Sequence, residues 1–504
     1  MVIVSSIILY DKRPYTSDDV IIQSILHEHT HLPGSGIAWL GEDNYIIKVP
    51  FYWLADSLFA NSRHIIFATL LFFNLVGFSL FFYSSWFFVK RFKLDINISR
   101  LSILWLASLT NLVGFFLYNP NLRNLEIGIA FMVLVLFAKY FDGNFDFSKP
   151  VKKILLGLAA VLLGLFFYSD AFFIYMFALP LLLFLAAERY FKEANHQKLN
   201  ASMGFLAVSF IISEAWHKLF VHFDIVTRPA DTHFIAYNQL WPQINQTIFS
   251  FSEMFSANFW GASVLSLGAI RTLANTAVLL FTFVVPFYLI IKKPATVNNR
   301  WKIFWLLQPL VITLVYIFSN NSSANGLPSG RFLVLLPFYM PMILVIGLES
   351  IKNMRIKRLA VGVLSLSILL NTAYIFNTYR TTQRTSPNQE NIEVINALET
   401  NGLDKGVGNY WDSAINNYLA NYKVDVIRSG CLDIQHWLMD DKLLSIKADR
   451  TFYIHDDRYA GDCTPELIAT RLGAPAKTVK VDDRITLLIY NYDITTRMYT
   501  SYYY

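Results

Sequence analysis

The fold is decided by apolar stretches such as Ile65-Ile-Phe-Ala-Thr-Leu-Leu-Phe-Phe-Asn-Leu-Val-Gly-Phe-Ser-Leu-Phe-Phe-Tyr-Ser-Ser-Trp-Phe-Phe-Val89, which contains no charged residue. A helix rises about 1.5 Å per residue, so this stretch can cross the roughly 30 Å hydrocarbon core of a bilayer. Similar runs occupy 154–168, 277–291 and 332–348. The chain of 504 residues is 55% hydrophobic and 15% charged, with a mean hydropathy of +0.41. Because soluble domains carry about 25% charged residues, this composition predicts a polytopic α-helical membrane protein.

About 11 membrane spans are expected. Residues 1–10 are apolar, but ten residues of helix rise only about 15 Å, so we interpret them as part of a shortened first span. Ten further spans are predicted at roughly 64–89, 101–118, 124–141, 153–169, 171–187, 201–220, 271–291, 303–319, 332–349 and 359–377.

The basic residues indicate how these spans are oriented. Alternate connections hold most of them, among them Lys90, Arg91, Lys152, Lys153, Arg189, Lys292, Lys293, Arg355 and Arg358. The short connections of the other set hold only Arg123 and Arg331, and long loops weigh less in this count. The positive-inside rule therefore assigns the first set to the cytoplasm. Because its basic residues set membrane orientation, the net charge of +6 does not indicate nucleic-acid binding.

Two domains are expected in a multi-pass protein of the cell membrane. Residues 1–377 are predicted to form a transmembrane domain with long outer loops at 11–63 and 221–270, and long loops usually carry function. Residues 378–504 are predicted to lie outside the cytoplasm. In the first loop, apolar residues recur at helical spacing over 20–27 and 49–59, which we interpret as helices lying on the membrane surface.

The tail has the pattern of a small α/β domain. Strands are predicted at 406–411 and 423–427, with helices at 391–399 and 413–422, and this is a β-α-β arrangement. Further strands are predicted at 451–455 and 485–490, with a helix at 465–472 between them. The two cysteines of the chain, Cys431 and Cys463, lie here. If the tail is exported they can form a disulfide, and two free thiols are the alternative.

The stretch Tyr15-Thr-Ser-Asp18-Asp19-Val-Ile-Ile-Gln23 offers two adjacent carboxylates where the chain leaves the first apolar segment. Such a pair is costly to desolvate at a membrane unless it binds cations or performs chemistry. Asp18 and Asp19 can hold a divalent metal, or one of them can act as a general base toward an acceptor hydroxyl. The alternative is a helix cap, because Ser-Asp-Asp before an apolar run is also a good capping sequence.

Three alternating histidines follow, and His27 and His29 flank Glu28. Alternation brings histidines to one face of a strand, whereas a helix separates them. They can bind a metal or a phosphate, and polar loop residues are the alternative. Lys48, further along the same loop, is a candidate phosphate partner.

Two turns on the predicted outer side carry further candidates. Arg123 occupies the turn Asn119-Pro-Asn-Leu-Arg123, and Glu126 begins the span that follows it. A carboxylate at membrane depth is a functional candidate, and an Arg–Glu pair joining two helices is the alternative. Arg331 ends a Gly/Ser/Asn-rich loop before another span, and its guanidinium suits a phosphate.

This layout resembles the GT-C superfamily of membrane glycosyltransferases, which includes the protein mannosyltransferases and the lipid A aminoarabinose transferases. The similar features are the acidic pair Asp18-Asp19 in a long first outer loop, the turn at Arg123–Glu126, the sequence Gly330-Arg331-Phe-Leu-Val-Leu-Leu-Pro337 leading into a late span, and the terminal α/β domain. The acidic pair departs from the commoner Asp-Glu, so either aspartate can match the catalytic position. The resemblance is one of layout more than of sequence signature.

The resemblance implies an enzyme that moves a sugar from a polyprenyl-phosphate donor to a glycan, lipid or protein acceptor at the outer membrane face, with inversion. Asp18 or Asp19 would deprotonate the acceptor, Glu126 would match a second acidic position, and Arg123 and Arg331 would neutralise the departing phosphate. Some members use a divalent metal such as Mg²⁺ or Mn²⁺. The alternative function is a transporter or flippase for polyprenyl-linked lipids or saccharides, for which we expect broken helices and repeat symmetry.

Overall fold

The computed structural model describes residues 17–34, 36–42, 48–50, 52, 63–109, 124–142, 150–169, 173–190, 196–228, 233–258, 263, 266–292, 300–320, 333, 335–381, 388–436, 439–461 and 463–501. They form two compact units. The helical unit takes the described residues of 71–213 and 231–383, and the α/β unit takes those of 10–70, 214–230 and 384–504.

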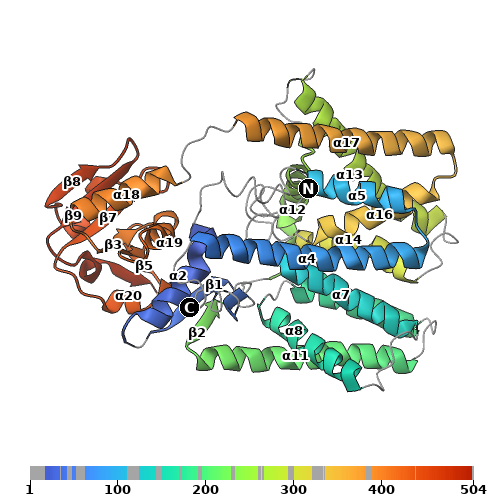
Figure 1. The fold of residues 1–504 in the computed structure, drawn as a ribbon, viewed down its shortest axis with the longest axis horizontal. Helices are drawn as coiled ribbons and strands as arrows, with labels where there is room; N and C mark the ends of the chain where they lie inside the picture. Colours follow the sequence, from blue (N-terminus) through green and yellow to red (C-terminus); the bar gives the residue numbers. More distant parts are fainter. Residues whose placement is uncertain are drawn as a thin grey trace. The chain divides into compact units, whose positions relative to one another are not determined.

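The helical unit is built from long apolar helices, many of which run in one general direction in Figure 1. In chain order the elements are α4 (Arg63–Phe92), α5 (Ile96–Ser108), α7 (Asn124–Phe141), α8 (Pro150–Ser169), the π-helical η3 (Ile174–Ala178), α10 (Leu179–Tyr190), α11 (His196–His222), the 3₁₀ turn η4 (Tyr237–Gln239), α12 (Leu240–Met254), α13 (Leu267–Lys292), α14 (Arg300–Phe318), α16 (Leu336–Ser350) and α17 (Met354–Thr381). The first residues of α4 and the last residues of α11 belong to the α/β unit.

Five described helices are long and apolar enough to cross a membrane. They span Pro150–Ser169, His196–His222, Leu267–Lys292, Trp301–Phe318 and Met354–Asn377, and the apolar α16 is shorter. The chain is therefore a mostly helical protein with the character of a membrane protein. The predicted segment 1–10 and the last part of the predicted span 101–118, residues 110–118, lie outside the described residues. Helix α12 in the long second loop was not predicted.

Aromatic side chains fill the core of the helical unit. The Phe131 ring of α7 lies 5.3 Å from Phe81 of α4 and 5.0 Å from Tyr339 of α16, measured between ring centroids. Trp305 of α14 packs against Tyr339 at 5.1 Å, and these four side chains are buried. Large interlocked rings hold these four helices in one arrangement, because small rotations would open voids between them.

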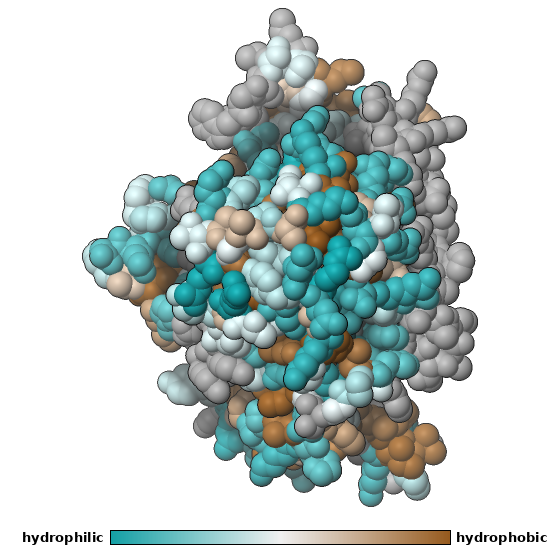
Figure 2. Space-filling view, turned by 90° about the vertical axis from the view of Figure 1, so that its left-hand side faces the viewer, coloured by the Kyte–Doolittle hydropathy of each residue, from teal (hydrophilic) through white to brown (hydrophobic). Residues whose placement is uncertain are grey.

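The α/β unit combines three distant stretches of chain. Its elements are α2 (Ser17–His31), β1 (Ala38–Glu42), β2 (Ile225–Arg228), α18 (Gln389–Thr400), β3 (Lys405–Gly408), α19 (Tyr410–Leu419), β4 (Asp425–Arg428), β5 (Asp433–Gln435), β6 (Met439–Asp440), α20 (Lys442–Ser445), β7 (Thr451–Asp456), α21 (Pro465–Leu472), β8 (Lys477–Lys480), β9 (Ile485–Tyr490), η8 (Ile494–Arg497) and β10 (Tyr499–Ser501). Figure 2 shows that one face of this unit is mainly hydrophilic, with small apolar patches.

A five-stranded sheet with the order β4-β3-β7-β9-β8 forms its centre. Strand β3 pairs in parallel with both β4 and β7, and the remaining pairs are antiparallel. Alternate residues of β7 enter opposite cores, since Phe452 and Ile454 face one apolar cluster and Tyr453 faces the other. Both faces of the sheet are therefore covered, as expected for parallel strands flanked by helices.

A second sheet, in the order β2-β1-β6, joins all three stretches of the unit. Strand β1 pairs in parallel with β2, with Ala38 opposite Ile225, and antiparallel with β6, with Trp39 opposite Met439. Two parallel strands, β5 and β10, form a further small sheet. The described part of the first long loop and the beginning of the second, which supplies β2, thus belong to the same folded unit as the tail.

The elements of the tail agree closely with those predicted from the sequence, and the structure shows which state the two cysteines adopt. Helix α21 and strand β9 have the predicted bounds, and α18, β4 and β7 differ from prediction by one or two residues at an end. The β3–α19 boundary differs, because Asn409 caps α19 by accepting from the backbone N–H groups of Trp411 and Asp412. Cys431 and Cys463 form a disulfide.

Candidate functional site

Helix α2 carries the acidic pair in its first turn and is buried along most of its length. Asp18 and Asp19 are its second and third residues, where carboxylates favour a helix through its dipole, and their side chains lie outside the described residues. From Val20 to Leu26 every side chain is buried, and helix α19 covers much of this surface. The interpretation of 20–27 as a membrane-surface helix is therefore corrected: the helix exists, but protein covers its apolar side chains.

The second half of α2 brings charge into the interior of the α/β unit. Glu28 is 2% exposed, and its Oε1 lies 3.9 Å from Nη2 of Arg428, which ends β4 and is 1% exposed. The other oxygen of Glu28 accepts from the backbone N–H of Asp440 at 3.1 Å. Among the described residues, the Arg428 guanidinium makes no hydrogen bond. A buried charge costs several kcal/mol when unpaired, so these two groups depend on each other.

The same environment changes the protonation of Glu28. Burial raises the pKa of Glu28 to about 7, against the opposing effect of the Arg428 charge and the hydrogen bond from Asp440. Burial also lowers the pKa of the Arg428 guanidinium. A carboxyl group that titrates near neutrality can accept or release a proton under physiological conditions. Sequence reasoning passed over Glu28, although its position between two histidines was visible.

The two histidines lie on a helix and point to different partners. The Nδ1 of His29 lies 2.7 Å from the carboxylate of Asp440. The His27 ring stacks on Tyr422, with centroids 3.7 Å apart, and on His31 at 4.2 Å. Burial, together with the charge of His31, lowers the pKa of His27 to about 4, so this ring is neutral at pH 7. The alternating histidines therefore lie neither on one face of a strand nor in a loop, the two arrangements considered from the sequence, but on helix α2.

The other predicted residues are described in part. Lys48 is completely buried. Glu126 is also completely buried, in the first turn of α7 in the helical unit. Near it the backbones of α7 and α4 approach closely, because a Cβ on Gly128 would lie 2.5 Å from the Gly77 carbonyl oxygen. A larger residue at position 128 would push the two helices apart near Glu126.

Arg123 and Arg331 lie outside the described residues, so the convergence of all predicted site residues stays a prediction. Asp18 and Asp19 belong to the α/β unit and Glu126 to the helical unit. Within the part of the chain that the structure describes, no group of three or more His, Cys, Asp or Glu side chains could hold a metal ion. The side chains of the acidic pair are outside that search, and the predicted metal role remains open to experiment.

A second cluster lies at the carboxyl ends of β3 and β7 and was not predicted. Asp412 is 3% exposed, close to the buried Asp456, and it accepts a hydrogen bond from the Asn409 side-chain amide. Arg458 clasps Asp456, with its Nη2 2.6 Å and its Nε 3.0 Å from Oδ2, and its Nη1 lies 2.8 Å from Glu390. Burial and the Asp456 charge raise the pKa of Asp412 to about 7.

The position of this cluster in the sheet is informative. Strand β3 has β4 on one side and β7 on the other, and such a switch in strand order opens a crevice at the carboxyl edge of a sheet. Two partly exposed rings, Trp411 and Tyr459, stack there with centroids 6.0 Å apart. Two polar residues were the sequence signals that could have found it: Asn409 within the strand predicted at 406–411, and Asp456 directly after the strand predicted at 451–455.

Comparison with models of known protein families finds no match for this chain, and comparison with curated proteins finds none either.

Proposed function

We propose that this protein is an integral-membrane glycosyltransferase that moves a sugar from a polyprenyl-phosphate donor to an acceptor outside the cytoplasm. The observation that carries the proposal is the setting of the acidic pair. Asp18 and Asp19 occupy the first turn of a helix whose body is buried in the α/β unit. Groups that act on a substrate need such a rigid support, because a shift of about 1 Å can cost 100-fold in rate.

Except for His27, the predicted residues keep a role in the proposal. Asp18 or Asp19 deprotonates the acceptor hydroxyl, and both can bind Mg²⁺ or Mn²⁺ if a metal takes part. Glu126 supplies a second acid, since an ionisable side chain buried at the start of an apolar helix is a functional candidate. Arg123 and Arg331 neutralise the departing lipid phosphate. The contact of His29 with Asp440 and the burial of Lys48 favour supporting roles for these two residues.

The acceptor is assigned to the carboxyl edge of the central sheet. The exposed rings of Trp411 and Tyr459 offer apolar faces, and the partly exposed guanidinium of Arg458 offers donors that bind hydroxyls. This combination suits a saccharide or another acceptor rich in hydroxyl groups.

Two arguments support the proposed location of the α/β unit outside the cytoplasm. Strand β1 pairs with β2 and with β6, so three stretches separated by membrane helices lie on one side of the membrane. This requires an even number of crossings between them, as the predicted spans give: six between 64 and 220, and four between 271 and 377. The Cys431–Cys463 disulfide favours an oxidising compartment, and hence the outer side.

A flippase without transfer chemistry is the second candidate, and specific helices favour it. Prolines lie within α13, α14 and α16, where they remove a backbone hydrogen bond, and η3 is a π-helical turn, a feature often found at functional sites. Transporters use such interrupted helices to form binding sites within the membrane.

The test is sugar transfer by the purified full-length chain in lipid nanodiscs, from a labelled polyprenyl-phosphate sugar. We expect Asp18→Asn together with Asp19→Asn to abolish transfer while donor binding remains. The matched control is Asp95→Asn, an exposed helix cap of α5. A double variant that folds and still transfers sugar would contradict the catalytic assignment. Lipid translocation without any sugar chemistry would favour the flippase, and a parallel assay with EDTA decides whether a divalent metal is needed.

A further inference from the structure

A cavity of about 570 Å³ lies among α7, α8 and α11 of the helical unit, and none of its lining residues is assigned to sugar transfer. Its volume is in the range of small-molecule sites. Its walls are mostly apolar, and they are formed by Met132, Val133, Leu136, Phe137, Leu155, Leu156 and Phe205, with Tyr140, Lys153, Ala201 and Ser202 as the remaining lining residues. An apolar cavity between helices that cross a membrane suits a hydrocarbon chain.

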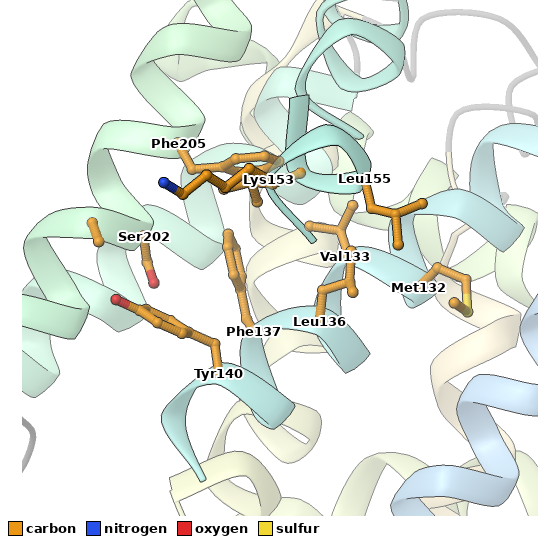
Figure 3. A pocket seen from close by; sticks show the side chains of 11 residues that line it. Met132, Val133, Leu136, Phe137, Tyr140, Lys153, Leu155, Ser202 and Phe205 are labelled. Carbon is orange, nitrogen blue, oxygen red and sulfur yellow. The ribbon is translucent and has the colours of Figure 1, made fainter. Parts of the chain in front are cut away.

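The cavity also has a polar side. Figure 3 shows the Lys153 side chain extending from α8 toward α11, with its ammonium on the same side of the cavity as the hydroxyls of Ser202 and Tyr140. Lys153 is exposed, and it has neither an ion pair nor a hydrogen bond with any residue that the structure describes. Its charge is therefore available to a ligand that occupies the cavity.

A second lysine adds positive charge at this end. The ammonium of Lys198 donates to the carbonyl oxygens of Tyr140 and Phe141 at 3.0 and 3.1 Å, at the end of α7. The nearby Asp142 is engaged by Arg91. The end of the cavity is thus cationic, and an anion bound there would meet Lys153 directly.

We propose that this cavity binds an anionic phospholipid, with one acyl chain among the apolar residues and the headgroup phosphate on Lys153. The charge pattern of the sequence assigns this end of the helices to the cytoplasmic leaflet, where anionic lipids attract basic residues. Headgroup charge decides the selectivity, because a hydrocarbon chain gains little by moving from the bilayer into an apolar cavity. The residues that line this cavity have no role in the proposed transfer reaction, and the test does not use sugar transfer.

The test is native mass spectrometry of the full-length protein in mild detergent with equal amounts of phosphatidylglycerol and phosphatidylcholine that carry the same acyl chains. We expect wild-type protein to retain phosphatidylglycerol preferentially. Lys153→Gln should lower that preference about fivefold, the contribution of one basic residue near a charged membrane surface. The matched control is Lys352→Gln, an exposed lysine after α16 that does not line the cavity.

A second pair of variants tests the cavity itself. Ala201→Trp should fill the cavity and reduce retention of both lipids, whereas Ala207→Trp, at an exposed position of the same helix that does not line the cavity, should leave it unchanged. Elution volume and unfolding temperature establish that each variant is folded. Equal retention of the two lipids by wild type, an unchanged preference in Lys153→Gln, or full lipid retention in a folded Ala201→Trp each overturns the proposal. Glycerol phosphate at the same concentration should not displace the lipid, because it lacks the chain.

Discussion

The carboxylate of Glu28 lies 3.9 Å from the guanidinium of Arg428, and both side chains are almost completely buried. The two residues are 400 positions apart, yet they meet inside one folded unit. This contact joins the helix that carries Asp18 and Asp19 to the end of strand β4. The orientation of the acidic pair therefore depends on the integrity of the tail.

The protonation of Glu28 should make the stability of the α/β unit depend on pH. Burial raises the pKa of Glu28 from 4.5 to about 7, so its stabilising contribution is fully present below pH 4.5 and is lost as the pH rises through about 7. Between pH 5 and pH 8 the unfolding free energy of Glu28→Gln should fall by about 1–3 kcal/mol less than that of the wild type. The measurement is pulsed hydrogen–deuterium exchange of the backbone amides of β7 and β9 at a series of urea concentrations, which gives the unfolding free energy at each pH.

The quantity to compare is the slope of the unfolding free energy with pH, because Gln removes the charge that faces Arg428 only above about pH 7, where Glu28 is ionised. Glu399→Gln, at an exposed position of α18, should leave the slope unchanged. An identical slope in Glu28→Gln and the wild type would contradict the attribution of the pH dependence to the raised pKa of Glu28.

The burial of α2 predicts a large effect of truncating its apolar side chains. Ile25 is completely buried, so Ile25→Ala should lower the unfolding free energy of the α/β unit by about 2–5 kcal/mol. Ile37→Ala, which removes the same atoms at a 36% exposed position, should cost far less. If α2 instead lay on lipid, Ile25→Ala would weaken vesicle binding and leave urea unfolding of the unit unchanged.

The disulfide should stabilise the tail and report its compartment. Cys431 and Cys463 are 32 residues apart, and closing a loop of that length is worth about 3–4 kcal/mol. We expect the double variant Cys431→Ala and Cys463→Ala to unfold at correspondingly lower urea concentration. In intact cells, an impermeant maleimide should label the wild type only after a reductant is added. Labelling without a reductant would mean that the bond does not form in the cell.

A polar network in the helical unit predicts strong coupling between two asparagines. The Asn275 amide of α13 donates to Asn371 Oδ1 of α17 at 3.1 Å and to the Ser256 carbonyl at 3.0 Å, and Asn371 donates back at 3.0 Å. Asn275→Leu alone should lower stability by roughly 1–2 kcal/mol, because its partners lose their bonds. The double variant with Asn371→Leu should recover part of this loss, whereas additive losses in thermal unfolding would show that the pair is not coupled.

Glu126 provides a prediction on activity in the helical unit. Glu126→Gln keeps the shape of the buried side chain but removes its acid–base function, so we expect a fall of about 100-fold or more in the rate of sugar transfer. Glu214→Gln, at an exposed position on α11, is the matched control. A folded Glu126→Gln protein with wild-type turnover would restrict this residue to a structural role.

The sequence predicted what depends on local pattern. Apolar length predicted α7 with its observed bounds and α8 within three residues, because spanning a bilayer imposes a length on each helix. Turn and strand residues predicted most of the tail. Asn409 was also a local signal, since an N-cap asparagine begins α19 three residues earlier than predicted.

What depends on distant partners was not predictable in the same way. An amphipathic segment such as 20–27 has the same pattern whether lipid or protein covers it, and here the cover is α19. The Glu28–Arg428 pair and the Asp412–Asp456 cluster form only when strands meet, so their pKa shifts have no signature in single stretches of sequence. The acidic pair itself was found from sequence, and its catalytic role stays a prediction.

The packing of α19 on α2 also determines when α2 can be covered during biosynthesis. Helix α19 begins 379 residues after α2 ends, which at about 5–20 residues per second is a delay of roughly 20–75 seconds. Throughout that time the apolar residues of α2 are made but their partner is not. The newly synthesised chain must shelter this segment, on the lipid surface or on a chaperone, until translation is nearly finished. A chain truncated before α19 would leave these residues permanently uncovered and would be marked for degradation.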